Sequence, residues 1–334
     1  MVQDKELSTP KEKRSWGKLL WVGKLIITLL ILSYIYRTFK NEQKGIQDVF
    51  AVFNSILTSE NSGILIFMLL LVPINWALES LKWRQLAKKV VQISFWDAFR
   101  GILTGLAVGV AAPAQLGDTI GRIAALRSDK RLQAIGAAIV SNGIQFYISV
   151  LIGALGWFSV QDKLDLKPGS KVILNSILLL IICLGWIVVL FRKRLTDWHP
   201  TRRYLQKLHS YLKIIGEYTG LDLFISTGYG MLRYMVFLTQ FVLALSLFNF
   251  PLTYLELGSC VALIFLAKTL IPAVNVLGDL GLREFTALFV FKQYNLPVEE
   301  IITATFLIWT INVLGPILIG IILIWKYKWR NLTR

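Results

Sequence analysis

Two stretches of the sequence repeat one pattern, a proline followed a few residues later by Gly-Asp-x-x-x-Arg. The residues of the two copies are Pro113, Gly117, Asp118 and Arg122, then Pro272, Gly278, Asp279 and Arg283. The distance from proline to glycine is two residues longer in the second copy, so the repeat is approximate. An arginine that faces a cavity can hold a phosphate through paired hydrogen bonds, and a lysine can hold one as a point charge. The pattern therefore indicates anion-binding chemistry.

Lys268 adds a third candidate cation, because it lies within an apolar segment four residues before Pro272. A charged side chain at membrane depth costs roughly 2.5–3.5 kcal/mol or more, and such residues are usually functional. The predicted headgroup or phosphate contacts are Arg122, Lys268 and Arg283. The predicted structural or gating residues are Pro113, Gly117, Asp118, Pro272, Gly278, Asp279, Gly281 and Glu284.

A purely structural role is the alternative for these charges. An acid and a base four residues apart pair on one helix face, and an acid stabilises a helix N-terminus. We favour that role for Asp118 and Asp279, whereas for the arginines and Lys268 the two roles stay equally open. Glu79 and Arg233 also carry charge, near the ends of two other apolar segments.

The segments that carry these motifs are too short to cross a bilayer. Gly101–Pro113 has 13 residues, which is about 20 Å of helix against about 30 Å of hydrocarbon. Gly258–Pro272 has 15 residues. Proline and glycine free backbone groups that hydrocarbon cannot satisfy, so such breaks survive only inside protein or beside a wet cavity. We predict re-entrant helical hairpins at about 101–127 and 258–291; two short kinked spans are the alternative.

The rest of the chain predicts an all-α polytopic membrane protein. Hydrophobic residues make up 55% of the sequence and charged residues only 17%, a composition unlike that of a soluble protein. About six apolar runs are long enough to span. They are Leu19–Tyr36, Gly63–Leu81, Ala134–Phe158, Val172–Phe191, Leu232–Phe250 and Ile301–Trp325.

Basic residues set the expected orientation. Most of the 36 Lys and Arg residues flank the run ends that face the cytoplasm if the N-terminus is inside. Both termini, residues 1–18 and 329–334, are then cytoplasmic, as is the loop at 192–230, and the single transmembrane domain covers 19–328. We read Gly228–Gly230 as part of that loop. The two hairpins would enter from opposite faces, which is the pattern of an inverted-repeat transporter in a bacterial-type inner membrane.

Other classes of chemistry find no support in the sequence. The two cysteines lie in apolar segments, and the two histidines have no carboxylate or cysteine at ligand spacing, so we expect no metal site. No catalytic triad, phosphate-binding loop or dinucleotide fingerprint is present, so we expect no cofactor and name no catalytic residue. The net charge of +16 lies beside the spans, where anionic headgroups account for it better than nucleic acid does.

The stretch LIPAVNVLGDLGLREFTALFVFKQYNLPVEEIITATFLIWTIN resembles the second signature of the lysylphosphatidylglycerol synthase transmembrane-region family, also called the flippase-like family. The positions that carry this resemblance are Pro272, Arg283, Glu284 and 297–300. The first copy of the motif and LESLKWRQL at the end of the second run match as well. Asp279 stands where many members have glycine, which weakens any argument from loop flexibility there.

The resemblance implies a membrane domain that moves lipids, without the soluble aminoacyl-transfer domain that some members carry. The expected partners are membrane lipids, either an anionic phospholipid or a polyprenyl phosphate. A separate lipid-modifying enzyme is a further candidate partner. Two other functions stay open. A membrane-embedded glycosyltransferase could use Asp118, Asp279 and Glu284 as its acids, and the chain could instead be a noncatalytic partner of a synthase.

Overall fold

A computed structural model describes residues 56, 58, 60–109, 116–126, 133–197, 199, 201–270 and 282–326. All regular structure among these residues is helical. Several predicted features lie outside the described residues: the first apolar run at 19–36, Pro113, Pro272, Gly278, Asp279 and Gly281.

Five helices of the described part are long and apolar enough to cross a membrane. They are α3 (Ser62–Ala87), α6 (Ala134–Val160), α7 (Pro168–Phe191), α10 (Gly220–Ser246) and a continuous helix over Glu300–Lys326. The last one contains α13 (Val298–Trp309), the π-helical turn η4 (Thr310–Leu314) and α14 (Gly315–Lys326). These five correspond to the second to sixth predicted runs, so the chain is a multi-pass membrane protein. A total of six spans stays a prediction.

The segment between the third and fourth of these helices is shorter than predicted. It contains α8 (Arg194–Asp197) and α9 (Arg203–Glu217), and α10 begins at Gly220. The predicted loop at 192–230 therefore ends at residue 219, and reading Gly228–Gly230 as a loop was wrong. The helix starts early because the Thr219 hydroxyl accepts from the Asp222 N–H while the Asp222 carboxylate accepts from the Thr219 N–H. Gly230 is helical and packs close to Ile148.

The first motif segment forms a pair of short helices, α4 (Phe95–Gly109) and α5 (Leu116–Ala124). They run antiparallel, since Gly101 lies beside Ala125 and Gly109 lies beside Asp118. Where they cross, a Cβ on Gly121 would collide with the Cα of Gly105. This pairing is what a helical hairpin requires. In the second segment α11 (Tyr254–Leu270) packs on α12 (Leu282–Phe291), which η3 (Lys292–Tyr294) follows. The depth of either pair in a bilayer stays a prediction.

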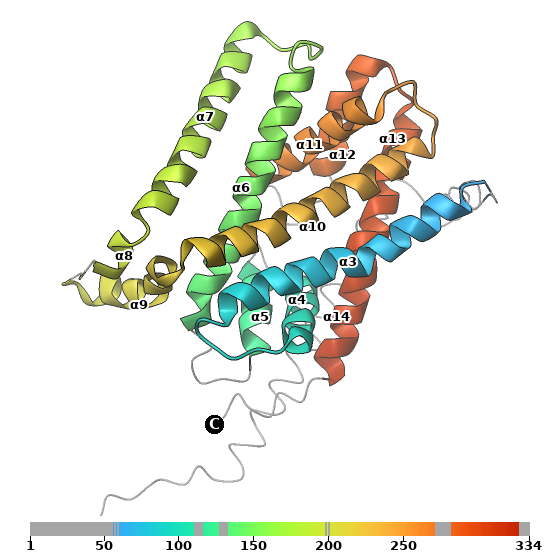
Figure 1. Cartoon of the computed structure of the whole chain (residues 1–334). Coiled ribbons are helices and arrows are strands. Elements are labelled where there is room, and N and C mark those ends of the chain that lie inside the picture. Colours follow the sequence, from blue (N-terminus) through green and yellow to red (C-terminus); the bar gives the residue numbers. More distant parts are fainter. Residues whose placement is uncertain are drawn as a thin grey trace, which may run out of the picture.

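Helix contacts follow similar patterns in two units of the described helices, as an internal repeat predicts, and Figure 1 shows how these helices are arranged. The first unit is α3–α4–α5–α6, and the second is α10–α11–α12–α13 with α14. Several contacts correspond. Within the units, α4 packs on α5 as α11 packs on α12, and α5 meets α6 as α12 meets α13; between the units, α4 packs on α14 as α11 packs on α6. The two first helices, α3 and α10, pack on each other. Lys89 pairs with Asp222 at one end of this pair and Gln240 bonds to the Met68 carbonyl at the other, so α3 and α10 run antiparallel.

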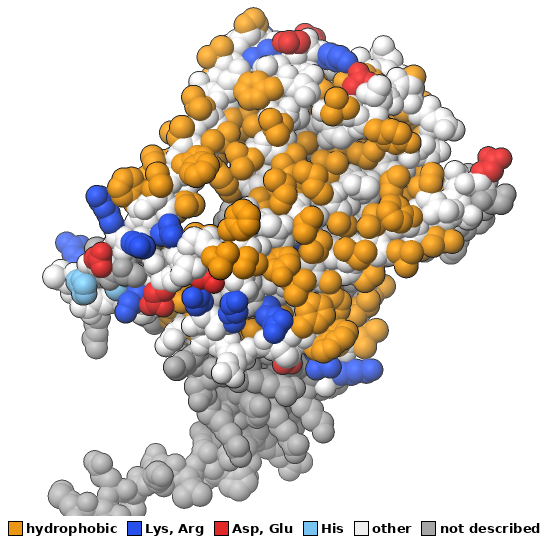
Figure 2. Space-filling model, viewed as in Figure 1, with side chains coloured by type: hydrophobic (Ala, Val, Ile, Leu, Met, Phe, Trp, Pro, Cys, Tyr) orange, Lys and Arg blue, Asp and Glu red, His pale blue; other side chains and the backbone are white. Residues whose placement is uncertain are grey.

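Apolar side chains dominate the visible face of the molecule, and charged ones gather toward its two ends (Figure 2). α7 shows this most clearly, because Leu178 is its one buried residue. Leu180, Trp186 and Leu190 of the same helix are each more than half exposed. A helix that exposes leucine and tryptophan along its length is suited to contact with lipid tails.

Candidate functional site

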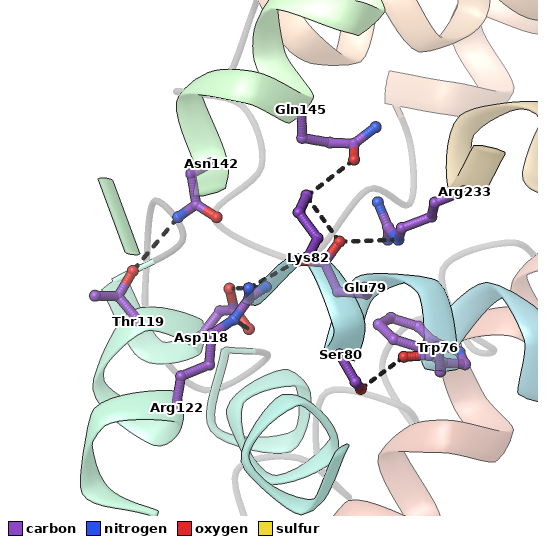
Figure 3. A network of polar contacts seen from close by, with 10 residues as sticks. All are labelled: Trp76, Glu79, Ser80, Lys82, Asp118, Thr119, Arg122, Asn142, Gln145 and Arg233. Carbon is purple, nitrogen blue, oxygen red and sulfur yellow. Dashed lines mark hydrogen bonds and ion pairs between the residues drawn. The ribbon is translucent and has the colours of Figure 1, made fainter. Parts of the chain in front are cut away.

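A network of charged side chains lies inside the helix bundle, centred on the carboxylate of Glu79 on α3 (Figure 3). Glu79 Oε2 lies 2.8 Å from Lys82 Nζ, and Oε1 lies 2.7 Å from Arg122 Nη1. Arg233 Nε, from α10, lies 3.2 Å from Glu79 Oε2. Glu79 and Lys82 are 2% and 1% exposed. One buried carboxylate is thus the shared counter-ion of three cations, which we call the Glu79 network.

Arg122 connects the Glu79 network to the first motif. Its Nη2 lies 2.7 Å from Asp118 Oδ2, and its Nε donates to Asp118 Oδ1 at 2.9 Å. This is a two-pronged contact, the strongest geometry that a guanidinium and a carboxylate can form. With Nη1 on Glu79, the same side chain bridges two acids on two helices. The ion pair that the spacing of Asp118 and Arg122 predicted is therefore present.

Neutral polar residues surround the charges. Lys82 Nζ donates to Gln145 Oε1 of α6 at 3.1 Å. The Arg233 guanidinium lies 5.5 Å from the centre of the Trp76 ring, within the range of a cation–π contact. Asn142 of α6 reaches the Thr119 hydroxyl of α5 at 3.5 Å, the long limit of a hydrogen bond. α3, α5, α6 and α10 each contribute side chains, so the site belongs to both repeat units.

Simple helix geometry puts the network well inside the bundle. Glu79 and Lys82 are three residues apart on α3, so their side chains share one face. Glu79 lies eight residues before the last residue of the helix, Ala87, a rise of about 12 Å. A lone charge would be unstable at such a position, and pairing is what allows these residues to stay ionised.

The charge balance of the network favours an anion. Lys82, Arg122 and Arg233 supply three positive charges, and Glu79 with Asp118 supplies two negative ones. The five charged side chains thus carry one net positive charge in a buried place. Arg233 Nε faces Glu79 without the alignment of a hydrogen bond, and its N–H has no other partner among the described residues. The network therefore has both charge and a donor to offer a phosphate.

The other predicted site residues that the structure describes are Arg283, Glu284, Lys268 and Gly117. Arg283 is buried on α12, where Nη2 lies 3.0 Å from Glu284 Oε1. It pairs with its neighbour Glu284, while Asp279 lies outside the described residues. Lys268 is half-buried near the end of α11. Gly117 is buried at the start of α5. The structure thus brings Asp118 and Arg122 together with Glu79, and it pairs Arg283 with Glu284.

Sequence reasoning missed Lys82 and Gln145 and undervalued Glu79 and Arg233. Lys82 was given no predicted role, although its side chain is 1% exposed. One signal could have corrected this: Glu79 and Lys82 have the i, i+3 spacing of a helical ion pair and sit at the end of an apolar run. Nothing comparable in the sequence joins Arg233 to them.

One polar contact stabilises each end of the bundle. At one end, Lys163 lies 2.7 Å from Glu256, whose carboxylate also accepts from the N–H and hydroxyl of Thr253. These bonds, the one from Lys163 first, lower the pKa of Glu256 to about 2. At the other end, the Tyr218 hydroxyl donates to the Leu86 carbonyl at 2.9 Å. Burial raises the pKa of Tyr218, so this donor keeps its proton.

Comparison with known proteins gives a family match over most of the chain. A family model described as "Lysylphosphatidylglycerol synthase TM region" matches residues 20–320. None of the curated proteins and none of the solved structures compared with the chain matches it. The family match includes four of the spanning helices, most of the fifth and the whole Glu79 network. The chain therefore belongs to the lysylphosphatidylglycerol synthase transmembrane-region family, whose description implies a membrane protein that acts on lipids.

Proposed function

We propose that the protein is a lipid flippase that moves an anionic phospholipid or a polyprenyl-phosphate-linked lipid across the membrane. The family points to lipids, and the site supplies a way to hold a phosphate. One observation carries the proposal: Glu79 is a buried carboxylate shared by Lys82, Arg122 and Arg233. A carboxylate and a phosphate can each bind a guanidinium through two of their own oxygens. Glu79 therefore acts as an internal counter-ion whose contacts a phosphate can take over.

The net positive charge explains why a lipid phosphate can compete with Glu79 for the three cations. With a monoanionic phosphate added, Lys82, Arg122, Arg233, Glu79 and Asp118 become neutral as a group. Without it, one excess charge stays in the bundle, where solvation is poor and Coulomb interactions are strong. The headgroup is then held among the helices while its tails stay in the bilayer beside lipid-facing surfaces such as that of α7.

The two antiparallel repeat units supply a physical basis for transport. Arg122 comes from the first unit and Arg233 from the second, and both contact Glu79. A rocking motion of one unit against the other would change these contacts and open the site to alternate faces, as in other inverted-repeat transporters. We propose a bacterial-type inner membrane with cytoplasmic termini. Arg84, Lys88 and Arg192 would then lie at the cytoplasmic end.

The glycosyltransferase alternative has weaker support. A catalytic acid or base must be free to exchange a proton with substrate. Asp118 holds Arg122 with both oxygens, and Glu284 holds Arg283. These carboxylates are suited to positioning cations, and the transport proposal uses them in that role.

A leaflet assay tests the proposal. Purified protein in liposomes would be given phosphatidylglycerol with a fluorescent acyl chain, and a membrane-impermeant quencher would report the headgroup in the outer leaflet. We expect rapid equilibration with wild-type protein and at least a tenfold slower rate with Arg122→Gln. Lys88→Gln is the matched control, because it removes one exposed cation next to α3. Wild-type rates no faster than those of empty liposomes, or equal rates for Arg122→Gln and wild type, would refute the proposal.

A further inference from the structure

The last spanning helix contains a π-helical turn, η4, at Thr310–Leu314. Its cause lies in the sequence: Pro316 has no N–H to donate to the carbonyl of Asn312, four residues earlier. The chain widens instead, and the Gly315 N–H bonds to the Thr310 carbonyl five residues back. Turns of this kind inside a helix are often found at functional sites. Asn312 lies within the turn and is 1% exposed.

The partner of Asn312 is Asn75 on α3, which is equally buried. Asn75 Nδ2 and Asn312 Oδ1 are 3.5 Å apart, so the amides touch at the longest distance of a hydrogen bond. The remaining atoms of the pair, Asn75 Oδ1 and Asn312 Nδ2, have no hydrogen-bond partner among the described residues. Trp76 follows Asn75 on α3, and its indole N–H is also buried with no hydrogen-bond partner among the described residues.

Such groups are costly, since a buried donor or acceptor without a partner destabilises the fold. Their chemistry indicates what would satisfy them. A metal cation would pair with the acceptor Asn75 Oδ1 and leave the N–H groups unpaired. An anion would pair with the N–H groups and leave Asn75 Oδ1 unpaired. A hydroxyl group both donates and accepts, so it can satisfy Asn75 Oδ1 and Asn312 Nδ2 together.

The amide pair also has a fixed place relative to the Glu79 network. Asn75 and Glu79 are four residues apart on α3, so they lie on one face, about 6 Å apart along the helix axis. A neutral hydrogen-bonding site and a cationic site are thus neighbours on one helix. Asn312 comes from the second repeat unit, so this contact, like the network, bridges the two units.

We propose that Asn75 and Asn312 form a subsite for the hydroxyl groups of the headgroup alcohol, a glycerol or a sugar, esterified to the phosphate at the Glu79 network. The inference rests on the proposed function and adds a substrate class to it: phosphate lipids whose headgroup carries free hydroxyls. The phosphate supplies the charge that the network recognises. The polyhydroxyl part distinguishes the cargo from other phosphate lipids.

The test compares two lipids of equal charge in the leaflet assay, phosphatidylglycerol and phosphatidylmethanol, which lacks headgroup hydroxyls. One hydrogen bond changes a rate ratio by about two- to tenfold. Wild-type protein should therefore move phosphatidylglycerol at least about twofold faster than phosphatidylmethanol. Asn75→Leu and Asn312→Leu should bring the ratio close to one, chiefly by slowing phosphatidylglycerol. Leucine resembles asparagine in size and is apolar, so both variants should fold, which a thermal unfolding curve checks. Lys88→Gln should keep the wild-type ratio.

The possible outcomes separate this inference from the proposed function. Equal wild-type rates for the two lipids, with both rates lost in Arg122→Gln, would overturn the subsite and leave the flippase proposal intact. An unchanged ratio in Asn75→Leu and Asn312→Leu would overturn the subsite as well, as would a parallel loss of both rates in folded Leu variants. Transport of neither lipid by wild-type protein would overturn both proposals.

Discussion

Replacing Glu79 with glutamine removes the shared counter-ion of the network and keeps its size. The side chain is 3% exposed and lies 2.7–3.2 Å from its three cations. After the change, Asp118 is the one carboxylate left in the network, and the net charge rises from one to two. Removing one partner from a buried ion pair typically costs about 3–5 kcal/mol, because the remaining charge stays buried. We therefore expect Glu79→Gln to be strongly destabilised.

Thermal unfolding in detergent measures this effect. At about 2 °C per kcal/mol, the value for larger domains, the melting temperature should fall by roughly 6–10 °C. Glu60→Gln is the matched control, since Glu60 is exposed just before α3 and its change should have little effect. Phosphatidylglycerol added to the micelles should restore more stability to Glu79→Gln than to wild type, because the variant site binds an anion without displacing a carboxylate.

Two results would refute this reasoning. If Glu79→Gln melts at the wild-type temperature, the contacts to Lys82, Arg122 and Arg233 do not stabilise the bundle. If it melts lower and anionic lipid raises its melting temperature no more than that of wild type, the network is structural and does not bind phosphate. A zwitterionic phosphatidylcholine at the same concentration shows how much of any rescue comes from tails alone.

Two further predictions concern helix packing and pH. Gly121→Ala should lower stability by about 1–3 kcal/mol, since the new methyl group meets backbone of Gly105, whereas Gly143→Ala, with open space around it, should be at least as stable as wild type by the same unfolding curves. Lys163→Gln should lower the melting temperature at pH 7. Because the pKa of Glu256 falls from 4.5 to about 2 in the folded protein, the pair stabilises fully above about pH 4.5 and loses its effect as the pH drops toward 2. A wild-type-to-variant difference that stays constant from pH 7 to pH 3 would contradict this.

The membrane helices were the predictable part of the fold. Runs such as Val172–Phe191 have no charge to interrupt them, and bilayer thickness sets their length, so composition is enough to find them. Helix ends were harder, as α10 shows: Gly228 and Gly230 suggested a loop, while the capping pair Thr219 and Asp222 sets the start. Local hydrogen bonds decided that boundary, and average hydropathy does not register them.

The site was predictable only where its contacts are local. Asp118 and Arg122 are four residues apart, so sequence alone could pair them. Arg233 meets Glu79 from a helix more than 150 positions away, and no single-sequence pattern reports such a contact. The sequence also did not show that the arginines of the two motifs have different partners. Their sequences are similar, yet Arg122 reaches the Glu79 network while Arg283 pairs with Glu284.

Native mass spectrometry of the purified protein tests the central claim, that the Glu79 network holds a lipid phosphate. Wild-type protein and Lys88→Gln should each retain a bound phosphate lipid through detergent washing. Arg122→Gln, which removes the side chain bridging Glu79 and Asp118, should lose that lipid while remaining folded. Equal retention of the same lipid by folded Arg122→Gln and wild-type protein would contradict the claim.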